Sequence, residues 1–174
     1  MTVIRPAKIE DAAAMARVHV DTWRTAYPGI VPEEFLANLS YERCQAGWLE
    51  VLTEPQSQTH AFVAENEQGE IVAIVSCGPI REAVVGYDGE LYTLYVLKSW
   101  QGTGCGKQLV RKVAQDLASR GYHTMLIWVL KDNPACRFYE RLGGRLTTER
   151  EVEIGGKQLV DVGYVWLDLA VFKD

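Results

Sequence analysis

A glycine-rich loop between a buried strand and a long helix constrains this chain more than any other feature. The strand-like run 91–97 (LYTLYVL) leads into the loop 101–107 (QGTGCGK), and a helical pattern then continues to Arg120. Alternating glycines let a backbone approach a ligand closely, and free N–H groups at a helix N-terminus attract an anion. We therefore expect the loop to hold a phosphate group, with Lys107 adding positive charge and Gln101 bracing the turn.

Counting along the loop excludes two common phosphate-binding motifs. A Walker loop needs glycine five residues before its Gly-Lys pair and Ser or Thr after it, but Gln101 and Gln108 occupy those positions. A dinucleotide-binding G-x-G-x-x-G motif starting at Gly102 or Gly104 needs glycine at position 107 or 109, where the chain has lysine and leucine. A glycine turn without a ligand stays as the alternative.

Composition narrows the class of protein. The chain has 174 residues, of which 48% are hydrophobic, and this favours a single domain over residues 1–174. The net charge of -5 offers no basic field for a nucleic acid or an anionic membrane. We find no leader-like N-terminus and no run of eighteen apolar residues. The four cysteines lack metal-site spacing, so we expect reduced thiols, no metal and a cytoplasmic location.

Periodicity predicts one mixed-sheet α/β domain without repeats or linkers. The expected order is β-α-α-β-β-β-α-β-α-β-β, and it includes a hairpin turn at Gly69 and a helix end at Gly121. A helix is expected to start at Asn133 and Pro134, with the asparagine as its cap. Expected helices cover about 9–20, a short turn after Pro32, 41–52, 104–120 and 133–142; expected strands cover 2–5, 61–65, 71–77, 90–97, 125–130, 146–154 and 158–169.

The pattern Gln101-x-x-Gly104-x-Gly106 resembles the Q/R-x-x-G-x-G/A signature of the GNAT N-acetyltransferases. The segment 133–143 (NPACRFYERLG) is similar to that family's other cofactor motif, although Gly144 stands where phenylalanine is frequent. The resemblance covers nearly the whole chain, and it implies a GNAT-like fold with a splayed central sheet and acetyl-CoA as cofactor. It assigns cofactor binding to Leu94, Tyr95, Val96, Gln101, Gly102, Thr103, Gly104, Cys105, Gly106, Lys107 and Asn133.

The same resemblance implies the catalytic groups. The backbone N–H of about Val96 would meet the acetyl oxygen, Tyr139 would act as general acid, and Glu90 would act as general base. Alternatives stay open, because Tyr139 could simply pack in the core and Glu90 could be a solvated carboxylate. Neither Cys105 nor Cys136 has an evident base beside it, so direct transfer in a ternary complex is favoured over a covalent intermediate.

The sequence gives fewer signals for the binding site of the acceptor amine than for that of the cofactor. Trp23 and Tyr27 would line the acceptor pocket by resemblance, although residues four apart on a helix also share a core face. The predicted function is acetyl-CoA-dependent transfer to a primary amine of a small molecule or peptide. The rivals are a non-catalytic acyl-CoA-binding regulatory module and a ligand-free interaction domain. The terminal hairpin and an edge strand would suit a homodimer, and the oligomeric state stays open.

Overall fold

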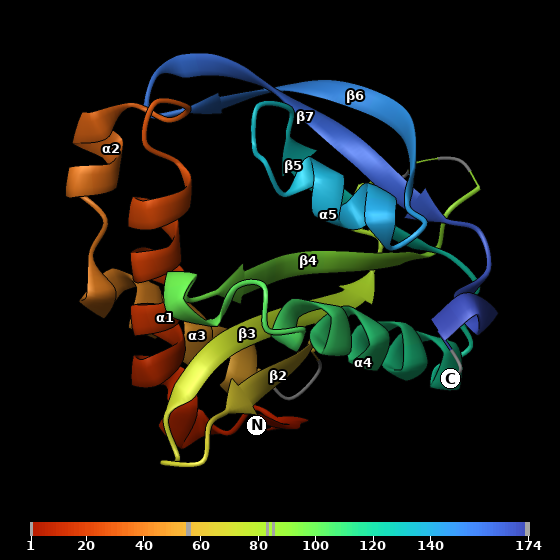
Figure 1. Cartoon of the computed structure of the whole chain (residues 1–174), viewed down its shortest axis with the longest axis horizontal. Coiled ribbons are helices and arrows are strands. Elements are labelled where there is room, and N and C mark those ends of the chain that lie inside the picture. Colours follow the sequence, from red (N-terminus) through yellow and green to blue (C-terminus); the bar gives the residue numbers. More distant parts are fainter. Residues whose placement is uncertain (1, 55–56, 83, 85, 173–174) are drawn as a thin grey trace.

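The computed structural model describes residues 2–54, 57–82, 84 and 86–172. Within these residues, seven strands form one mixed sheet in the order β1-β2-β3-β4-β5-β7-β6 (Figure 1). The strands are β1 (Val3–Pro6), β2 (His60–Glu65), β3 (Ile71–Pro79), β4 (Gly89–Val96), β5 (Met125–Leu130), β6 (Arg145–Ile154) and β7 (Lys157–Trp166). The helices are α1 (Ala12–Ala26), α2 (Glu33–Ala37), α3 (Tyr41–Thr53), α4 (Cys105–Ser119) and α5 (Cys136–Arg141).

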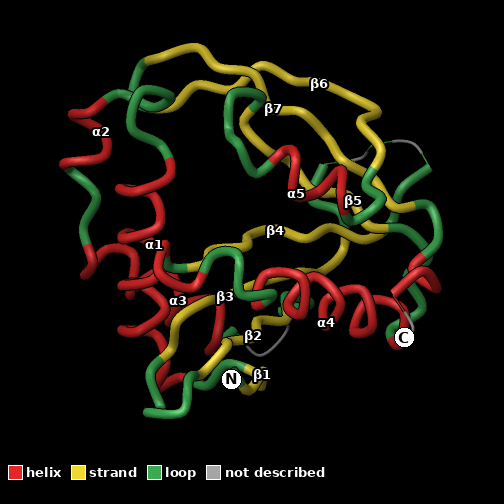
Figure 2. The backbone as a smooth tube through the Cα atoms, in the orientation of Figure 1, coloured by secondary structure: helices red, strands yellow, loops and turns green. Residues whose placement is uncertain are grey.

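The sheet has two halves that meet at the start of β4. Strands β1 to β4 are antiparallel neighbours, and β5, β7 and β6 form a second antiparallel group. In the described residues, β4 and β5 pair in parallel at Gly89 with Met125 and at Glu90 with Leu126, and no further pairs follow. Beyond that point the two strands diverge (Figure 2). The predicted splay of the central sheet is therefore confirmed.

Helices cover both faces of the first half. Helices α1 and α3 pack on one face, where Met15 contacts the cluster containing Val63 and Ile74. Helix α4 covers the other face, because its apolar residues recur at three- and four-residue spacing and meet β3 and β4. On the second half, α5 lies against β5 and β7 (Figure 1), with Tyr139 packed on Tyr164 and Trp166.

Positive backbone φ angles fix both ends of α4. Gly104, the N-cap, has φ of 90°, and Gly121, just beyond the last turn, has φ of 87°. Both values lie in the left-handed region that favours glycine. The glycines therefore set where the helix begins and ends, as the sequence predicts.

Three predicted boundaries were wrong. Helix α1 extends to Ala26 rather than ending near residue 20, since Trp23 and Tyr27 pack with the apolar cluster under the β6–β7 hairpin. Helix α5 begins at Cys136, because the Asn133 side chain accepts from the Ala135 N–H and the first turn is 3₁₀-like. Strand β7 ends at Trp166, and a 3₁₀ turn over Leu169–Phe172 follows. In addition, three described helices precede β2 where the predicted order had two.

Some features bear on the class of protein. None of the described helices combines the length and the apolar character needed to cross a membrane. All four cysteines lie in the described part of the chain and are free. The same part contains no group of three or more potential metal ligands among His, Cys, Asp and Glu.

Candidate active site

A cavity of about 540 Å³ opens where β4 and β5 diverge. Its walls come from the second half of β4, the glycine loop, α5 and the C-terminal turn of α1. Among the predicted site residues, the following line it: Tyr27, Leu94, Tyr95, Val96, Gln101, Gly102, Gly104, Gly106, Lys107, Asn133 and Tyr139. The topology therefore brings together two motifs that are about 30 residues apart in sequence.

The described lining of this cavity is cationic. Lys98, Lys107 and Arg141 contribute to it, and no aspartate or glutamate does. In a chain with a net charge of -5, this is a local concentration of positive charge. Another cavity, of about 520 Å³, is lined by the acidic Asp132 and Glu140 as well as by the basic Lys131 and Arg137. The first cavity is therefore the better site for an anionic ligand.

The N-terminus of α4 supplies free hydrogen-bond donors to the cavity. The first helical bond runs from the Gln108 N–H to the Gly104 carbonyl, so the N–H groups of Cys105, Gly106 and Lys107 have no partner in the described protein. Built on Gly102 or Gly104, a Cβ would meet nothing within 4 Å, which shows that these glycines serve backbone conformation. This is the geometry with which helix N-termini bind phosphate.

The side chains of the glycine loop have different structural roles. The Gln101 amide donates to the Val96 carbonyl at 3.0 Å, and this contact braces the turn. The Thr103 hydroxyl donates to the Trp100 carbonyl, and the Cys105 side chain is buried in the core. Neither Thr103 nor Cys105 lines the cavity, so any contact from these two residues would come from backbone groups.

Strand β4 presents an unpaired edge to the cavity. Leu97 donates its N–H to Val72 in β3, and successive N–H groups of a strand point to alternate sides. The N–H groups of Val96 and Leu94 therefore point away from β3, toward the side from which β5 has separated. A backbone donor at Val96 thus faces the cavity, where the resemblance predicted one.

Tyr139 reaches the cavity from α5. Its ring is 4% exposed and packs against Phe138, Tyr164 and Trp166. Its hydroxyl has no hydrogen-bond partner among the described residues, whereas the nearby Tyr164 hydroxyl donates to Glu140 at 2.9 Å. Burial raises the pKa of Tyr139 above its usual value, so the phenol stays protonated. The hydroxyl therefore keeps a hydrogen that it can donate in a hydrogen bond.

Aromatic residues form the wall opposite α5. Tyr95 stacks on His19 at 4.4 Å, and Trp23 lies 4.5 Å from Tyr27. Tyr27 lines the cavity but Trp23 does not, so Trp23 supports the wall from behind. Burial lowers the pKa of His19 to about 4, which keeps its ring neutral. These rings define an apolar side of the cavity next to the cationic loop.

Glu90 lies apart from this cavity. It is six residues before Val96 on β4, about 20 Å along an extended strand, and its carboxylate is 2% exposed. Arg81 binds it through the backbone N–H at 2.9 Å and through the guanidinium at 3.1 Å. The predicted base is therefore held by an ion pair, on the part of β4 that still pairs with β5.

The lining residues outside the prediction are Lys98, Pro134, Ala135, Phe138 and Arg141 and, on the last turns of α1, Thr22, Thr25 and Ala26. The predicted helix stopped near residue 20, before these positions. A signal was present, since Val18, Thr22, Thr25 and Ala26 continue the spacing of one helical face.

Comparisons with known proteins agree with this geometry. The family model described as FR47-like protein matches residues 80–152. YuaI of Bacillus subtilis, which is named as an uncharacterised N-acetyltransferase, is 39% identical over 173 residues, covering 99% of this chain and 97% of that protein. An uncharacterised N-acetyltransferase of Mycobacterium tuberculosis is 29% identical over 151 residues, covering 83% and 90% of the two chains.

Solved structures share the fold. PaiA N-acetyltransferase from Thermoplasma acidophilum, in complex with coenzyme A, superimposes with a TM-score of 0.72 at 19% identity, covering 92% of this chain and 98% of that one. A ribosomal-protein-alanine N-acetyltransferase from Brucella melitensis gives a TM-score of 0.73 at 21% identity, covering 95% and 99%. With the close relationship to YuaI, these matches lead to one conclusion: the chain belongs to the GNAT superfamily of N-acetyltransferases, enzymes that take their acetyl group from acetyl-CoA.

Proposed function

We propose that this protein transfers an acetyl group from acetyl-CoA directly to a primary amine of a small molecule or peptide, with both substrates bound at once. One observation carries the proposal. The free N–H groups of α4, the unpaired edge of β4 and the unpartnered Tyr139 hydroxyl all belong to one cavity.

The loop residues fit the pyrophosphate of acetyl-CoA. The N–H groups of residues 105–107 would hold its oxygens, and Lys98, Lys107 and Arg141 would balance its charge. The edge of β4 at Leu94 and Val96 would bind the amide groups of the pantetheine arm, as a neighbouring strand would. Asn133, whose side chain accepts from Ala135, lies across the cavity and would complete this wall.

Acetyl-CoA supplies an activated thioester, so the protein has to position groups and stabilise charge rather than form a covalent bond. The Val96 N–H would stabilise the negative charge that develops on the acetyl oxygen. Tyr139 would give the proton on its Oη to the departing sulfur. Burial raises the pKa of the phenol, so the hydroxyl carries its proton before the transfer.

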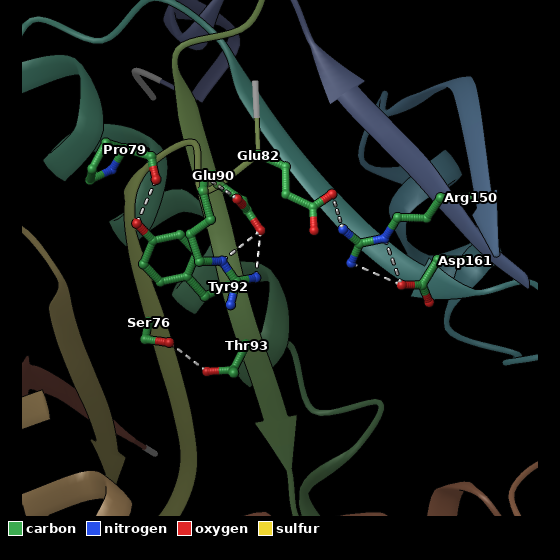
Figure 3. Close-up of polar contacts among 9 residues, drawn as sticks. Ser76, Pro79, Glu82, Glu90, Tyr92, Thr93, Arg150 and Asp161 are labelled. Carbon is green, nitrogen blue, oxygen red and sulfur yellow. Dashed lines mark hydrogen bonds and ion pairs between the residues drawn. The ribbon is translucent and has the colours of Figure 1, made fainter. Parts of the chain in front are cut away.

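The amine has to lose a proton, and for this we retain Glu90 as the proposed base, acting through water. Direct contact would require Arg81 to move away from the carboxylate, since the guanidinium and the backbone N–H of Arg81 both bind it. In this proposal, water carries the proton along β4, past Thr93 and the Ser76 hydroxyl, which lie 2.7 Å apart (Figure 3).

A thiol-release assay tests the proposal. The purified protein is mixed with acetyl-CoA and a panel of primary amines, and free CoA is measured against the protein alone. Amine-dependent release supports an enzyme. Binding of CoA by calorimetry without release from any amine would favour the non-catalytic acyl-CoA-binding module instead.

We also propose that residues 1–174 act as one domain, since one sheet runs through the described chain. The sequence also favoured a homodimer through the terminal hairpin and an edge strand, but the charge of the edge strand β6 opposes such pairing. Glu149, Glu151 and Glu153 alternate along this edge strand and so share one face, and antiparallel self-pairing would set glutamate against glutamate.

A further inference from the structure

The acetyl-transfer cavity has an open end and a closed end. Most of the exposed residues in its wall lie in or beside the glycine loop, between Lys98 and Lys107. The most buried residues in its wall are Thr22 of α1, which is 6% exposed, and Tyr139 of α5, which is 4% exposed. The proposed pyrophosphate site therefore lies at the open end, and the closed end lies between α1 and α5.

Helix α1 supplies the part of the wall that the proposed cofactor contacts leave free. Thr22, Thr25 and Ala26 line the cavity, and their spacing of three and four residues places them on one face of the helix. Tyr27 follows as the C-cap and lines the cavity as well. All four side chains are uncharged, and three of them are small. An acceptor bound beside the cofactor therefore meets a small, uncharged surface on α1.

A packed apolar cluster lies behind Tyr27. The centre of the Tyr27 ring is 4.5 Å from that of Trp23, and the Trp23 ring is 5.9 Å from that of Phe35 in α2. The cluster continues to the buried Leu130 and Leu159 of the second half of the sheet. Of its described members, Tyr27 alone lines the cavity. The cavity therefore ends at Tyr27, and a dry core begins there.

The β6–β7 hairpin holds this cluster in place (Figure 1). Gly155, in the hairpin turn, packs so closely on α2 that a Cβ built on it would lie 2.8 Å from the Cβ of Phe35. Lys157 donates from Nζ to the carbonyl of Ile30 at 2.8 Å. These contacts fix the loop after α1 between α2 and the hairpin. Because packed interiors yield little, the wall at Tyr27 has little room to retreat.

A closed and dry end limits what can bind there. Each methylene group that fits and is buried strengthens binding about fourfold. A group too large for the space has to displace packed side chains, which weakens binding. A second charge on the acceptor would lose its hydration against uncharged side chains, which is also unfavourable. Length and charge therefore decide which amines fit.

Resting on the proposed acetyl transfer, we propose that the acceptor is a small-molecule primary amine whose remaining substituent is short and uncharged. The wall formed by Thr22, Ala26 and Tyr27 sets the length of this substituent. A longer chain, such as that of a peptide, would have to displace the cluster behind Tyr27.

Bisubstrate probes test this inference without turnover. In each probe the CoA sulfur is joined through an acetyl group to the nitrogen of a straight-chain alkylamine, and the affinity is measured by calorimetry. We expect the affinity to rise about fourfold per methylene over the first carbons and then to fall about tenfold or more when the chain meets the wall. A probe made from diaminopropane should bind at least about tenfold more weakly than the propylamine probe, because it buries a second charge.

Ala26→Leu should shift this profile to shorter chains. Leucine adds bulk to the wall and is a good helix former, so the fall in affinity should come earlier while the affinity for free CoA stays within about threefold. Ala13→Leu is the matched control, because it makes the same change on the solvent-exposed face of the same helix. We expect it to leave the profile unchanged.

Three results would overturn the inference. They are an affinity that levels off with chain length, as for a chain that passes Thr25 into water, tight binding of a probe that carries a dipeptide, and equal profiles for Ala26→Leu and the wild type. The proposed function fails separately, if the thiol-release assay shows no acetylated amine. Probes that follow the expected profile would then still support a site for short amines, whereas probes that bind no more tightly than free CoA would overturn the inference as well.

Discussion

Replacing Tyr139 with phenylalanine separates catalysis from folding. The hydroxyl has no partner among the described residues, so its removal breaks no hydrogen bond, and we expect stability to change by less than about 0.5 kcal/mol. The same hydroxyl is the proposed donor to the departing sulfur. A general acid contributes about 100-fold or more, so kcat should fall by at least that factor.

Tyr164→Phe is the matched control. Tyr164 is also nearly buried, it packs against Tyr139, and its hydroxyl donates to Glu140 at 2.9 Å. Removing it should cost about 1 kcal/mol, or about 3 °C in Tm for a chain of this size. Because this hydroxyl is directed to Glu140, kcat should change by less than about threefold, well below the contribution of a general acid.

Three measurements on each variant test the role of the Tyr139 hydroxyl: thiol release with saturating amine, CoA affinity by calorimetry, and Tm. We expect Tyr139→Phe to lose turnover while it keeps CoA affinity and Tm. Turnover within threefold of the wild type would refute the role of Tyr139. A loss of Tm larger than that of Tyr164→Phe would show that the hydroxyl has a structural partner.

Three further predictions follow from the structure. Gly104→Ala and Gly121→Ala should each lower the free energy of unfolding in urea by about 1 kcal/mol, since both glycines have φ near 90° and open space around them. Calorimetry should show weaker CoA binding for Gly104→Ala only. The free energy of unfolding should fall by about 3 kcal/mol in full between about pH 6.5 and 4, because burial lowers the pKa of His19 to about 4 and only the unfolded chain binds a proton at His19 in this range. Urea unfolding of His19→Gln over the same pH range should lack this fall. Glu90→Gln should lower kcat about 100-fold if the carboxylate is the base, and a variant whose Tm falls while kcat is retained would mark the contact with Arg81 as structural only.

Much of the fold could be predicted from local sequence. Strand β5 lies at the expected residues, and the ends of α4 lie within one residue of the prediction, because buried runs and glycine caps are local signals. The end of α1 could not be predicted in this way. Its last two turns are stabilised by packing against Val152 and Leu159 of the distant hairpin, which no neighbouring residue reveals.

The residues of the candidate site likewise differ in how well local sequence predicts them. Its cofactor side is a continuous motif, and most of the residues predicted there line the cavity. The contact of Arg150 with Glu82 could not be predicted, because the two residues are 68 positions apart and only the folded chain brings them together. The resemblance to the GNAT family predicted Glu90 as the general base, with a solvated loop carboxylate as the alternative. The structure shows instead a carboxylate buried beneath Arg81.

Acetyl-CoA labelled with ¹³C at the acetyl carbonyl gives the most direct test of the central claim. The labelled compound is incubated with the protein and a mixture of amines that includes amino acids, and the products are analysed by mass spectrometry. We predict one labelled acetyl group on an amine nitrogen for each CoA thiol released, and none left on the protein. Release of CoA without any labelled amine, or label bound to Cys105 or Cys136, would contradict direct transfer to an amine.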